Sequence, residues 1–286
     1  MGEVRLMVCG YTMTPSNSAK PAKPPKPPFE EYPEWMRKTL GEEFTKKTET
    51  QFGINTGAIL SSVEASDFYK ALPDLFRTAQ KEYEESFEVK LLMTPSPPTF
   101  AKKSYASAID KSYRSNVLEN WSWPNEPRWG WVTPKNWCEK INDLARTTVV
   151  CKYLDGPIFL AKRLQELAAA KGLTSRVKSQ ERDSGYYAQH FYAKVPVPIV
   201  SLEMEQSEAL VDFEIQLTTQ MQEVLRDLSH SFYEEQRMSQ DDDQQWKWDH
   251  SSARFRSSFM GHTLHLLEGV IVELREMKNK KAEQDQ

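Results

Sequence analysis

The order of the strand-like and helix-like segments places this chain in the α+β class. Residues 144–153 (LARTTVVCKY) are apolar and rich in β-branched side chains, the composition of a buried strand. The Asp-Gly-Pro sequence at 155–157 is a helix start signal, and an apolar stripe of helical spacing continues it through residues 158–170. Three more strand-like segments follow, at residues 173–178, 187–194 and 209–217. This order of strand, helix and three strands, with a helix after them, predicts an α+β sandwich.

The N-terminal part is expected to be a tail followed by helices. Residues 1–29 include the run TPSNSAKPAKPPKPP, whose proline, lysine and serine content is typical of an extended, disordered tail. Residues 30–64 are expected to form an N-terminal helical segment, because their first apolar side chains have helical spacing. A longer helix is expected at about 65–87, with Pro73 marking a start or a kink within it.

The main domain is predicted to span residues 65–238, and the remaining residues 239–286 are expected to hold an acidic turn and a helix. The turn is the run of three aspartates at 241–243. The helix carries several large apolar residues at helical spacing, which are Phe259, Leu264, Leu267, Val270, Ile271 and Leu274. Such a helix either packs on the domain or mediates association, and the sequence leaves both alternatives open.

Composition excludes some classes of protein. The chain has 286 residues, of which 39% are hydrophobic, and a formal net charge of −4, so it does not coat nucleic acid through global charge. Its three cysteines lack the paired spacing of a zinc site. No apolar run approaches the roughly 18 residues of a membrane span. These features predict a soluble, cytoplasmic protein that has no membrane partner.

Two neighbouring motifs point to a nucleotide site. The run Gly185-Tyr186-Tyr187-Ala188-Gln189-His190 supplies aromatic rings that can stack on a base. The strand-like run at 211–217 alternates, so that Phe213, Ile215 and Leu217 lie on one face and Asp212, Glu214 and Gln216 on the other. The second, polar face is a row of potential metal or hydroxyl ligands near the aromatic rings.

The glycine-tyrosine loop followed by a Glu-X-Gln strand resembles the synthetase domain of the RelA/SpoT alarmone enzymes, and the toxic small-synthetase branch looks closest. The resemblance covers about residues 65–238 and is strongest from 141 to 233. It implies a mixed, mostly antiparallel sheet flanked by helices, related to nucleotidyltransferases. It also implies transfer of the β,γ-pyrophosphate of ATP to a ribose 3′-hydroxyl, with Mg²⁺ as cofactor.

The resemblance also assigns roles to single residues. Asp143 and Glu214 match the two carboxylates that hold the magnesium, and Glu214 could also take the proton of the hydroxyl. Tyr186 matches the tyrosine that stacks on the acceptor base, and Gly185 before it permits close approach of the backbone. The other two acceptor contacts are expected from His190 and Gln216. His230 matches a histidine in the helix that follows this strand in the family. Its role is either to support the site or to stabilise the structure, and both alternatives stay open.

The ATP site is expected in a basic block before the first long strand. Lys103, Ser104, Ser107 and Lys111 resemble the Lys-Ser, Ser, Lys pattern of the family, and Arg146 is assigned to the same site. Two lysines eight residues apart on a helix project to roughly the same side and can grip one polyphosphate. A solvated helical face would show similar spacing. The family arginine two positions before the first lysine is replaced by Ala101.

The acceptor is left with several possibilities. Arginines that the family carries after the loop tyrosine and after the Glu-X-Gln motif are replaced, by Tyr187 and by Thr218. Because arginine is the usual bidentate reader of phosphate, their loss weakens the case for a free GDP or GTP acceptor. Residues 102–140 hold seven Lys and Arg against four acids, and five of the eight tryptophans. These could stack and neutralise a tRNA end, although packing is the expected role for most of the tryptophans.

The main prediction is therefore a growth-inhibiting toxin that modifies the CCA 3′ end of tRNA and is neutralised by a separate antitoxin protein. The first alternative is an alarmone synthetase that uses guanosine or adenosine nucleotides as acceptors. The second alternative is an inactive module that binds nucleotide or RNA. The oligomeric state is left open.

Overall fold

A computed structural model describes residues 24–94, 99–228 and 244–284 of the chain. The acidic turn at 241–243, His230 and most of the predicted tail at 1–29 lie outside the described residues. Among the described residues, none of the helices combines the length and the apolar content that a membrane-spanning segment needs.

Three helices form the N-terminal layer. A short 3-10 turn, η1 (Phe29–Glu31), leads into α1 (Tyr32–Leu40), which ends where Gly41 adopts a left-handed conformation with φ of 68°. The second helix, α2 (Lys46–Ala65), begins with a capping box between Thr45 and Thr48. The third, α3 (Asp67–Phe87), is capped by Ser66 and contains Pro73 within its first turns.

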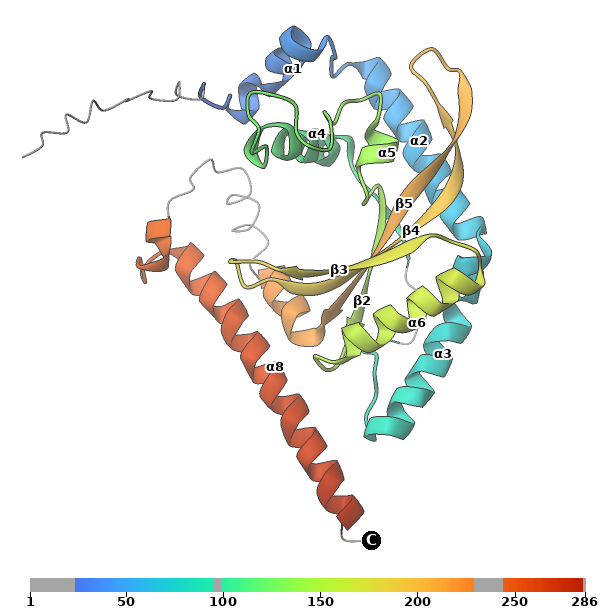
Figure 1. Cartoon of the computed structure of the whole chain (residues 1–286), viewed down its shortest axis with the longest axis vertical. Coiled ribbons are helices and arrows are strands. Elements are labelled where there is room, and N and C mark those ends of the chain that lie inside the picture. Colours follow the sequence, from blue (N-terminus) through green and yellow to red (C-terminus); the bar gives the residue numbers. More distant parts are fainter. Residues whose placement is uncertain (1–23, 95–98, 229–243, 285–286) are drawn as a thin grey trace, which may run out of the picture.

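The sheet has five strands in the order β1-β2-β5-β4-β3. They are β1 (Ala101–Lys102), β2 (Ala145–Cys151), β3 (Ser175–Glu181), β4 (Tyr187–Val200) and β5 (Gln206–Thr219). β2 runs parallel to β5, and the other neighbouring pairs are antiparallel. The mostly antiparallel sheet with helices beside it confirms the predicted α+β class (Figure 1).

The β4–β5 hairpin is longer than the two strands predicted at 187–194 and 209–217, because proline does not end β4. The amide of Lys194 donates to the carbonyl of Thr174, on the side of β4 that faces β3. Pro196 and Pro198 have the same parity, so their missing amides point away from β5 and break no bond of that ladder.

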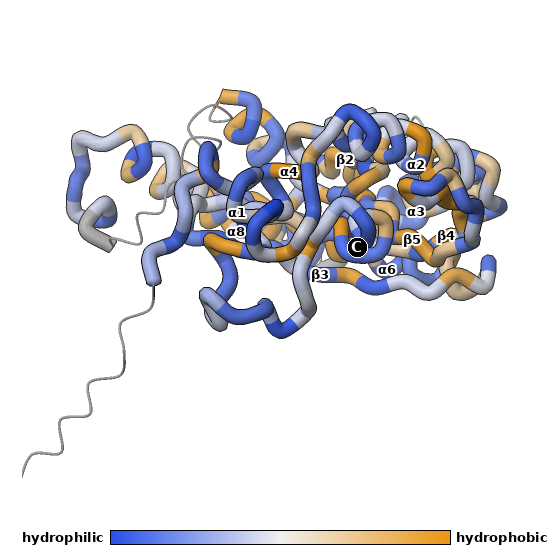
Figure 2. The backbone as a smooth tube through the Cα atoms, turned by 90° about the horizontal axis from the view of Figure 1, so that it is seen from above, coloured by the Kyte–Doolittle hydropathy of each residue, from blue (hydrophilic) through white to orange (hydrophobic). Residues whose placement is uncertain are grey.

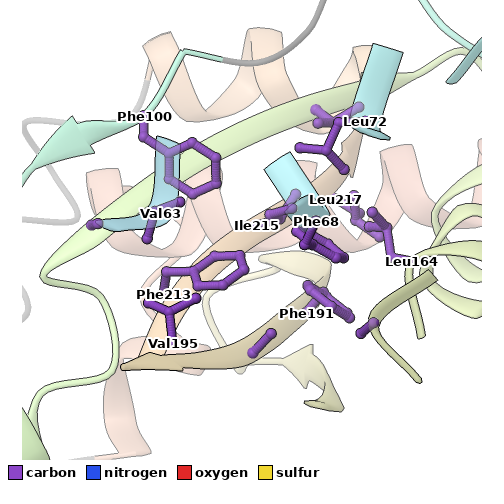
Figure 3. Close-up of a cluster of buried hydrophobic side chains, with 14 of the residues drawn as sticks. Val63, Phe68, Leu72, Phe100, Leu164, Phe191, Val195, Phe213, Ile215 and Leu217 are labelled. Atoms are coloured by element: carbon purple, nitrogen blue, oxygen red, sulfur yellow. The ribbon is translucent and has the colours of Figure 1, made fainter. Parts of the chain in front are cut away.

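The core lies on one face of the sheet, against α2, α3 and the crossover helix α6 (Gly156–Ala170). Phe191, Phe213 and Ile215 project from β4 and β5 into this core, as Figure 3 shows. Phe68 of α3 stacks on Phe191 with ring centroids 5.7 Å apart. In Figure 2 the apolar segments gather around β4, β5, α2, α3 and α6. The sheet therefore has one face covered by helices, and its opposite face can carry polar side chains.

The connection between β1 and β2 forms a second, smaller cluster with α1. It contains α4 (Tyr105–Tyr113), the π-helical turn η2 (Arg114–Leu118) and α5 (Trp137–Lys140). Trp123 is buried in this cluster, Trp137 of α5 is buried in the main core, and Trp131 packs edge-to-face on Trp35. Three of the five tryptophans of the basic block thus serve packing, in agreement with the role expected for most of them.

In the C-terminal part, the described residues form a helix at 220–228, the 3-10 turn η3 (Gln244–Lys247) and the long helix α8 (Ala253–Gln284). In Figure 1, α8 runs diagonally from the end of β3 past the rest of the domain. Arg275 of α8 donates to both carboxylate oxygens of Asp155, at 3.3 and 2.8 Å, and to the hydroxyl of Tyr83. The helix therefore packs on the domain, which was one of the two expected alternatives.

Glu268 is a buried carboxyl on the side of α8 that faces the domain. Burial raises the pKa of this carboxyl, while Thr219 and Gln222 offset part of that rise. A raised pKa in the folded state means that stability is greatest below the ordinary carboxyl pKa of about 4.3 and falls as the pH rises through the raised value. We expect Glu268→Gln to stabilise the protein by about 1 kcal/mol at pH 7. Thermal unfolding should be measured at pH 7 and near pH 4. The variant should be more stable than wild type at pH 7 and equally stable near pH 4. Glu273→Gln, at an exposed position of α8, is the control.

Candidate functional site

The face of the sheet opposite the core carries two polar rows that cross four strands. Since register partners point to the same face, one row holds Arg176, Tyr192, Glu214 and Arg146. The neighbouring row holds Lys178, His190, Gln216 and Thr148. Four of the predicted site residues, from three separate strands, therefore lie in adjoining rows of one face.

Glu214 is held by its neighbours on this face. Its side chain is 4% exposed, and its Oε1 lies 2.5 Å from Nδ1 of His190. Gln216 donates to Oε2 at 3.1 Å. Burial by itself would raise the pKa of Glu214, but the hydrogen bonds from His190 and Tyr192 and the charge of His190 outweigh it and lower the pKa. Glu214 is therefore ionised at neutral pH and held in one orientation.

Asp143 sits between two ammonium groups just before β2. Lys103 Nζ lies 2.9 Å from Oδ2, and Lys111 Nζ lies 2.7 Å from Oδ1. Although burial opposes ionisation, the two ammonium groups hold the pKa of Asp143 well below its usual range. Arg146 is more distant, with its guanidinium 4.0 Å from Oδ2. Three side chains predicted to bind ATP, Lys103, Lys111 and Arg146, thus surround Asp143, which was predicted to bind magnesium.

The two serines of the predicted ATP site begin α4. The Ser104 side chain accepts from the amide of Ser107 and donates to its hydroxyl at 2.8 Å. This N-cap orients the helix so that Lys111 reaches back to Asp143 from the last turn. Both serines are exposed, so their hydroxyls are accessible to a ligand.

The two carboxylates are close enough to influence each other. The negative charge of Asp143 acts to raise the pKa of Glu214, but the contacts with His190 and Tyr192 lower it by more. The charges of Asp143 and Glu214 both raise the pKa of Tyr192. The part of the chain that the structure describes holds no cluster of three or more His, Cys, Asp or Glu side chains suited to a metal ion. Two carboxylates are nevertheless a fitting donor set for Mg²⁺, which usually takes one or two of them and completes its shell with phosphate and water oxygens.

Two consecutive tyrosines, Tyr186 at the end of the loop and Tyr187 at the start of β4, have different partners. The hydroxyl of Tyr186 lies 3.1 Å from Nε2 of His190, which joins it to the polar face. Tyr187 instead turns toward α8, where its hydroxyl lies 2.8 Å from His262 Nδ1 and its ring stacks on His265 with centroids 3.6 Å apart. Tyr187, where the resemblance led us to expect an arginine, therefore fastens the start of β4 to α8.

Gly185 packs against the backbone of α8. Its φ is 75°, and a Cβ there would come within 2.8 Å of Gly261 Cα and even closer to the carbonyl oxygen of Ser258. A side chain at this position would push the loop and α8 apart. The glycine that was predicted from the resemblance is required here by two separate constraints, the left-handed φ and the close approach.

We expect Gly185→Ala to destabilise the protein by at least about 2 kcal/mol more than Gly172→Ala does. Gly172 is a matched control, because its φ is 72° and a Cβ there meets nothing within 4 Å. The backbone strain is thus shared, and the difference reports the contact with α8. Urea unfolding measures both free energies. Equal losses in the two variants would mean that the loop does not depend on this contact.

Sequence reasoning missed a group of side chains that supports Glu214. Arg176 donates to both oxygens of the buried Asp212, at 2.7 and 3.1 Å, and its guanidinium lies 4.5 Å from the ring centroid of Tyr192. The hydroxyl of Tyr192 in turn bonds to Glu214 and lies 3.2 Å from Nδ1 of His190. The period-2 parity that Tyr192 shares with His190 was the available signal for it.

Neither a protein-family model nor a curated protein matches this chain. Among solved structures, it is similar to small alarmone synthetase 1 from Bacillus subtilis, with 16% identity, a TM-score of 0.45, and coverage of 75% of this chain and 100% of that one. The same enzyme bound to AMPCPP matches at 20% identity and a TM-score of 0.41, over 73% of this chain and 94% of that one. A GTP pyrophosphokinase family protein from Streptococcus pneumoniae matches at 17% identity and a TM-score of 0.43, over 73% of this chain and 92% of that one. These three similar structures are thus two of a small alarmone synthetase and one of a pyrophosphokinase family protein.

Proposed function

We propose that this chain is an ATP-dependent pyrophosphokinase that transfers the β,γ-pyrophosphate of ATP to the ribose 3′-hydroxyl of a purine nucleotide. The observation that carries this proposal is the pairing of two buried carboxylates, Asp143 and Glu214, with separate partners on one polar face. Asp143 is surrounded by lysines, and Glu214 is held by hydrogen-bonding groups. This division suits a reaction in which phosphates bind at one end and a hydroxyl is activated at the other.

The lysine end would bind ATP. Lys103 and Lys111 share one carboxylate, so they carry one positive charge in excess and can turn to the β- and γ-phosphates of ATP. Arg146, whose side chain is 52% exposed, can add a bidentate contact. Asp143 and Glu214 would hold Mg²⁺ together with phosphate oxygens, and the ion would supply neutralisation of the phosphate charge.

The glutamate end would activate the acceptor. The 3′-oxygen attacks the β-phosphorus of ATP, the bond from that phosphorus to the α,β-bridging oxygen breaks, and AMP leaves with that oxygen. Glu214 takes the proton of the hydroxyl, which its lowered pKa permits because the group is ionised at neutral pH. His190 Nδ1 orients the carboxylate, while Nε2 binds the hydroxyl of Tyr186, whose ring stacks on the acceptor base.

A nucleotide acceptor is favoured over tRNA because two of the five tryptophans of the basic block are buried and a third packs on Trp35. Trp123 and Trp137 are 5% and 2% exposed, so they cannot stack on the unpaired bases of a tRNA end. In addition, Lys178 of β3 lies in the same row as His190 and Gln216 and is exposed. In this proposal its ammonium group would contact the 5′-phosphate of a nucleotide whose ribose lies over Glu214.

The tRNA 3′ end is the second candidate acceptor. Trp129 is 68% exposed, and Arg128 lies 5.8 Å from the centroid of its ring. An exposed indole beside a guanidinium is suited to stack on a base and contact a phosphate. A toxin of this kind would require a separate antitoxin protein.

The test is incubation of the purified chain with ATP labelled on the β-phosphate and with Mg²⁺, offering GDP, GTP, AMP and deacylated tRNA separately. Label on a free nucleotide, with AMP released in equal amount, is the expected result. Label on tRNA would replace the nucleotide acceptor by the second candidate. Transfer to none of the acceptors, with ATP or RNA still bound, would refute an enzyme and favour an inactive binding module.

A further inference from the structure

The long helix α8 packs on the domain with its polar side. Its contacts come from Gly261 and His262, which meet the loop before β4, and from Arg275, which is bonded to Asp155 and Tyr83. Farther along, Asn279 donates to the carbonyl of Phe87 at 3.3 Å. Amphipathic helices usually bury an apolar stripe and expose the polar one. In α8 this arrangement is reversed.

The outward side of α8 is apolar over most of its length. Eight large apolar side chains on it are 37–68% exposed, and they are Phe259, Met260, Leu266, Leu267, Val270, Ile271, Leu274 and Met277. At 3.6 residues per turn these positions form one stripe, and the contacts with the domain lie on the opposite side of the helix. A contiguous apolar surface of this size is typical of an interaction site, whereas singly scattered apolar residues are ordinary.

The spacing within the stripe is that of a helix that pairs with another helix. Met260, Leu267 and Leu274 are seven residues apart, and Leu264 and Ile271 lie four residues after the first two of them. This is a heptad pattern with leucine or methionine at d and leucine or isoleucine at a. The neighbouring positions Val270 and Met277 widen the same seam. A second helix with a matching seam is the shape that this surface fits.

The stripe is long enough to pair with a second helix over several turns. The eight exposed apolar side chains follow one another along α8 from Phe259 to Met277, so a second helix laid along the stripe would cover all of them at once. We propose that α8 docks against α8 of a second copy of this chain in a two-fold symmetric dimer. In a two-fold symmetric dimer the same surface of each copy forms the interface, so the α8 stripe of each copy would cover that of the other.

A lipid surface fits this helix less well than a second copy does. Helices that lie on membranes keep a basic polar face in water, but the polar side of α8 is buried against the domain. Exposed glutamates, Glu273 and Glu276, also lie on the same stretch of helix. The inference rests only on α8 and does not depend on the proposed function.

Dimer formation would also affect the loop that carries Tyr186 beside the polar face of the sheet. Gly261, within the proposed interface helix, packs against Gly185, which precedes Tyr186. Holding α8 in place therefore holds the loop that presents Tyr186 to His190. Association would thus order the proposed acceptor loop without adding any residue to the site.

Sedimentation velocity of the full chain at micromolar concentrations, without nucleotide, tests the proposal. Wild type is expected to sediment as a dimer. Leu267→Asp combined with Leu274→Asp is expected to weaken association at least about a hundredfold, because each copy then carries two charges into the seam. Leu210→Asp, at a 61% exposed position of β5, is the matched control and should remain dimeric.

A second variant guards against loss of the helix itself. Leu267→Ala with Leu274→Ala keeps strong helix formers and removes only apolar contact, so it should also weaken association while circular dichroism is unchanged. A monomeric wild type, or a dimer that these variants leave intact, would overturn the proposal. Cosedimentation of a monomeric wild type with phosphatidylglycerol vesicles, lost in the aspartate variant, would identify lipid as the occupant instead.

Discussion

Replacing Glu214 by glutamine is expected to lower the rate of pyrophosphate transfer by about 10²- to 10⁴-fold, the range that a positioned general base contributes. Glutamine keeps the size of the side chain and part of its hydrogen bonding to His190 and Gln216. It cannot accept the proton of the hydroxyl. The loss should therefore appear in kcat, and KM for MgATP should rise as well, because Glu214 is also a proposed magnesium ligand.

The matched control is Glu208→Gln, an exposed glutamate of the same strand. It should leave both kcat and KM unchanged. Calorimetric titration with a nonhydrolysable ATP analogue in the absence of Mg²⁺ needs neither turnover nor the metal, and both variants should then bind the analogue like wild type. A Glu214→Gln enzyme that keeps a tenth or more of its activity would exclude Glu214 as the base.

The strands and the polarity of each face could be predicted from the sequence, because period-2 alternation is a local property. Phe213, Ile215 and Leu217 are buried, and Glu214 and Gln216 lie on the opposite face, as the alternation in β5 indicates. The single crossover helix was predictable for the same reason, from its start signal and its stripe. These elements carry their own evidence in adjacent residues.

Contacts between distant segments could not be predicted in this way. Arg176 and Asp212 are 36 residues apart, and their pairing follows from the register of β3, β4 and β5, which no local pattern fixes. The contact of Tyr187 with His262 spans 75 residues and depends on where α8 docks. The apolar residues of α8 predicted a helix, but their exposure follows from the polar residues that anchor its other side.

The same limit applies to Asp143. Sequence placed it at the entrance of a strand and placed Lys103 and Lys111 on a separate segment, as a metal ligand and as phosphate contacts. The structure joins the three in one buried cluster. Their charges therefore stabilise the fold as well as serving the proposed reaction, and the two roles can be separated by mutation.

Asp143→Asn is expected to lower the free energy of unfolding by about 3–5 kcal/mol, because it leaves buried ammonium groups without a counter-charge. The Lys103 side chain is only 8% exposed, and burial already lowers its pKa despite the neighbouring carboxylate. Urea unfolding measures the loss. Asp74→Asn, which breaks an exposed ion pair with Arg77, is the control and should cost no more than about 1 kcal/mol.

Adding Lys103→Met to Asp143→Asn separates stability from activity. The double variant removes one of the buried cations together with the carboxylate, so a large part of the lost stability should return. Pyrophosphate transfer should not return, since a magnesium ligand and a phosphate contact are both missing. If activity recovered along with stability, the Asp143 cluster would be a purely structural element, and the ATP site would have to lie elsewhere on the polar face.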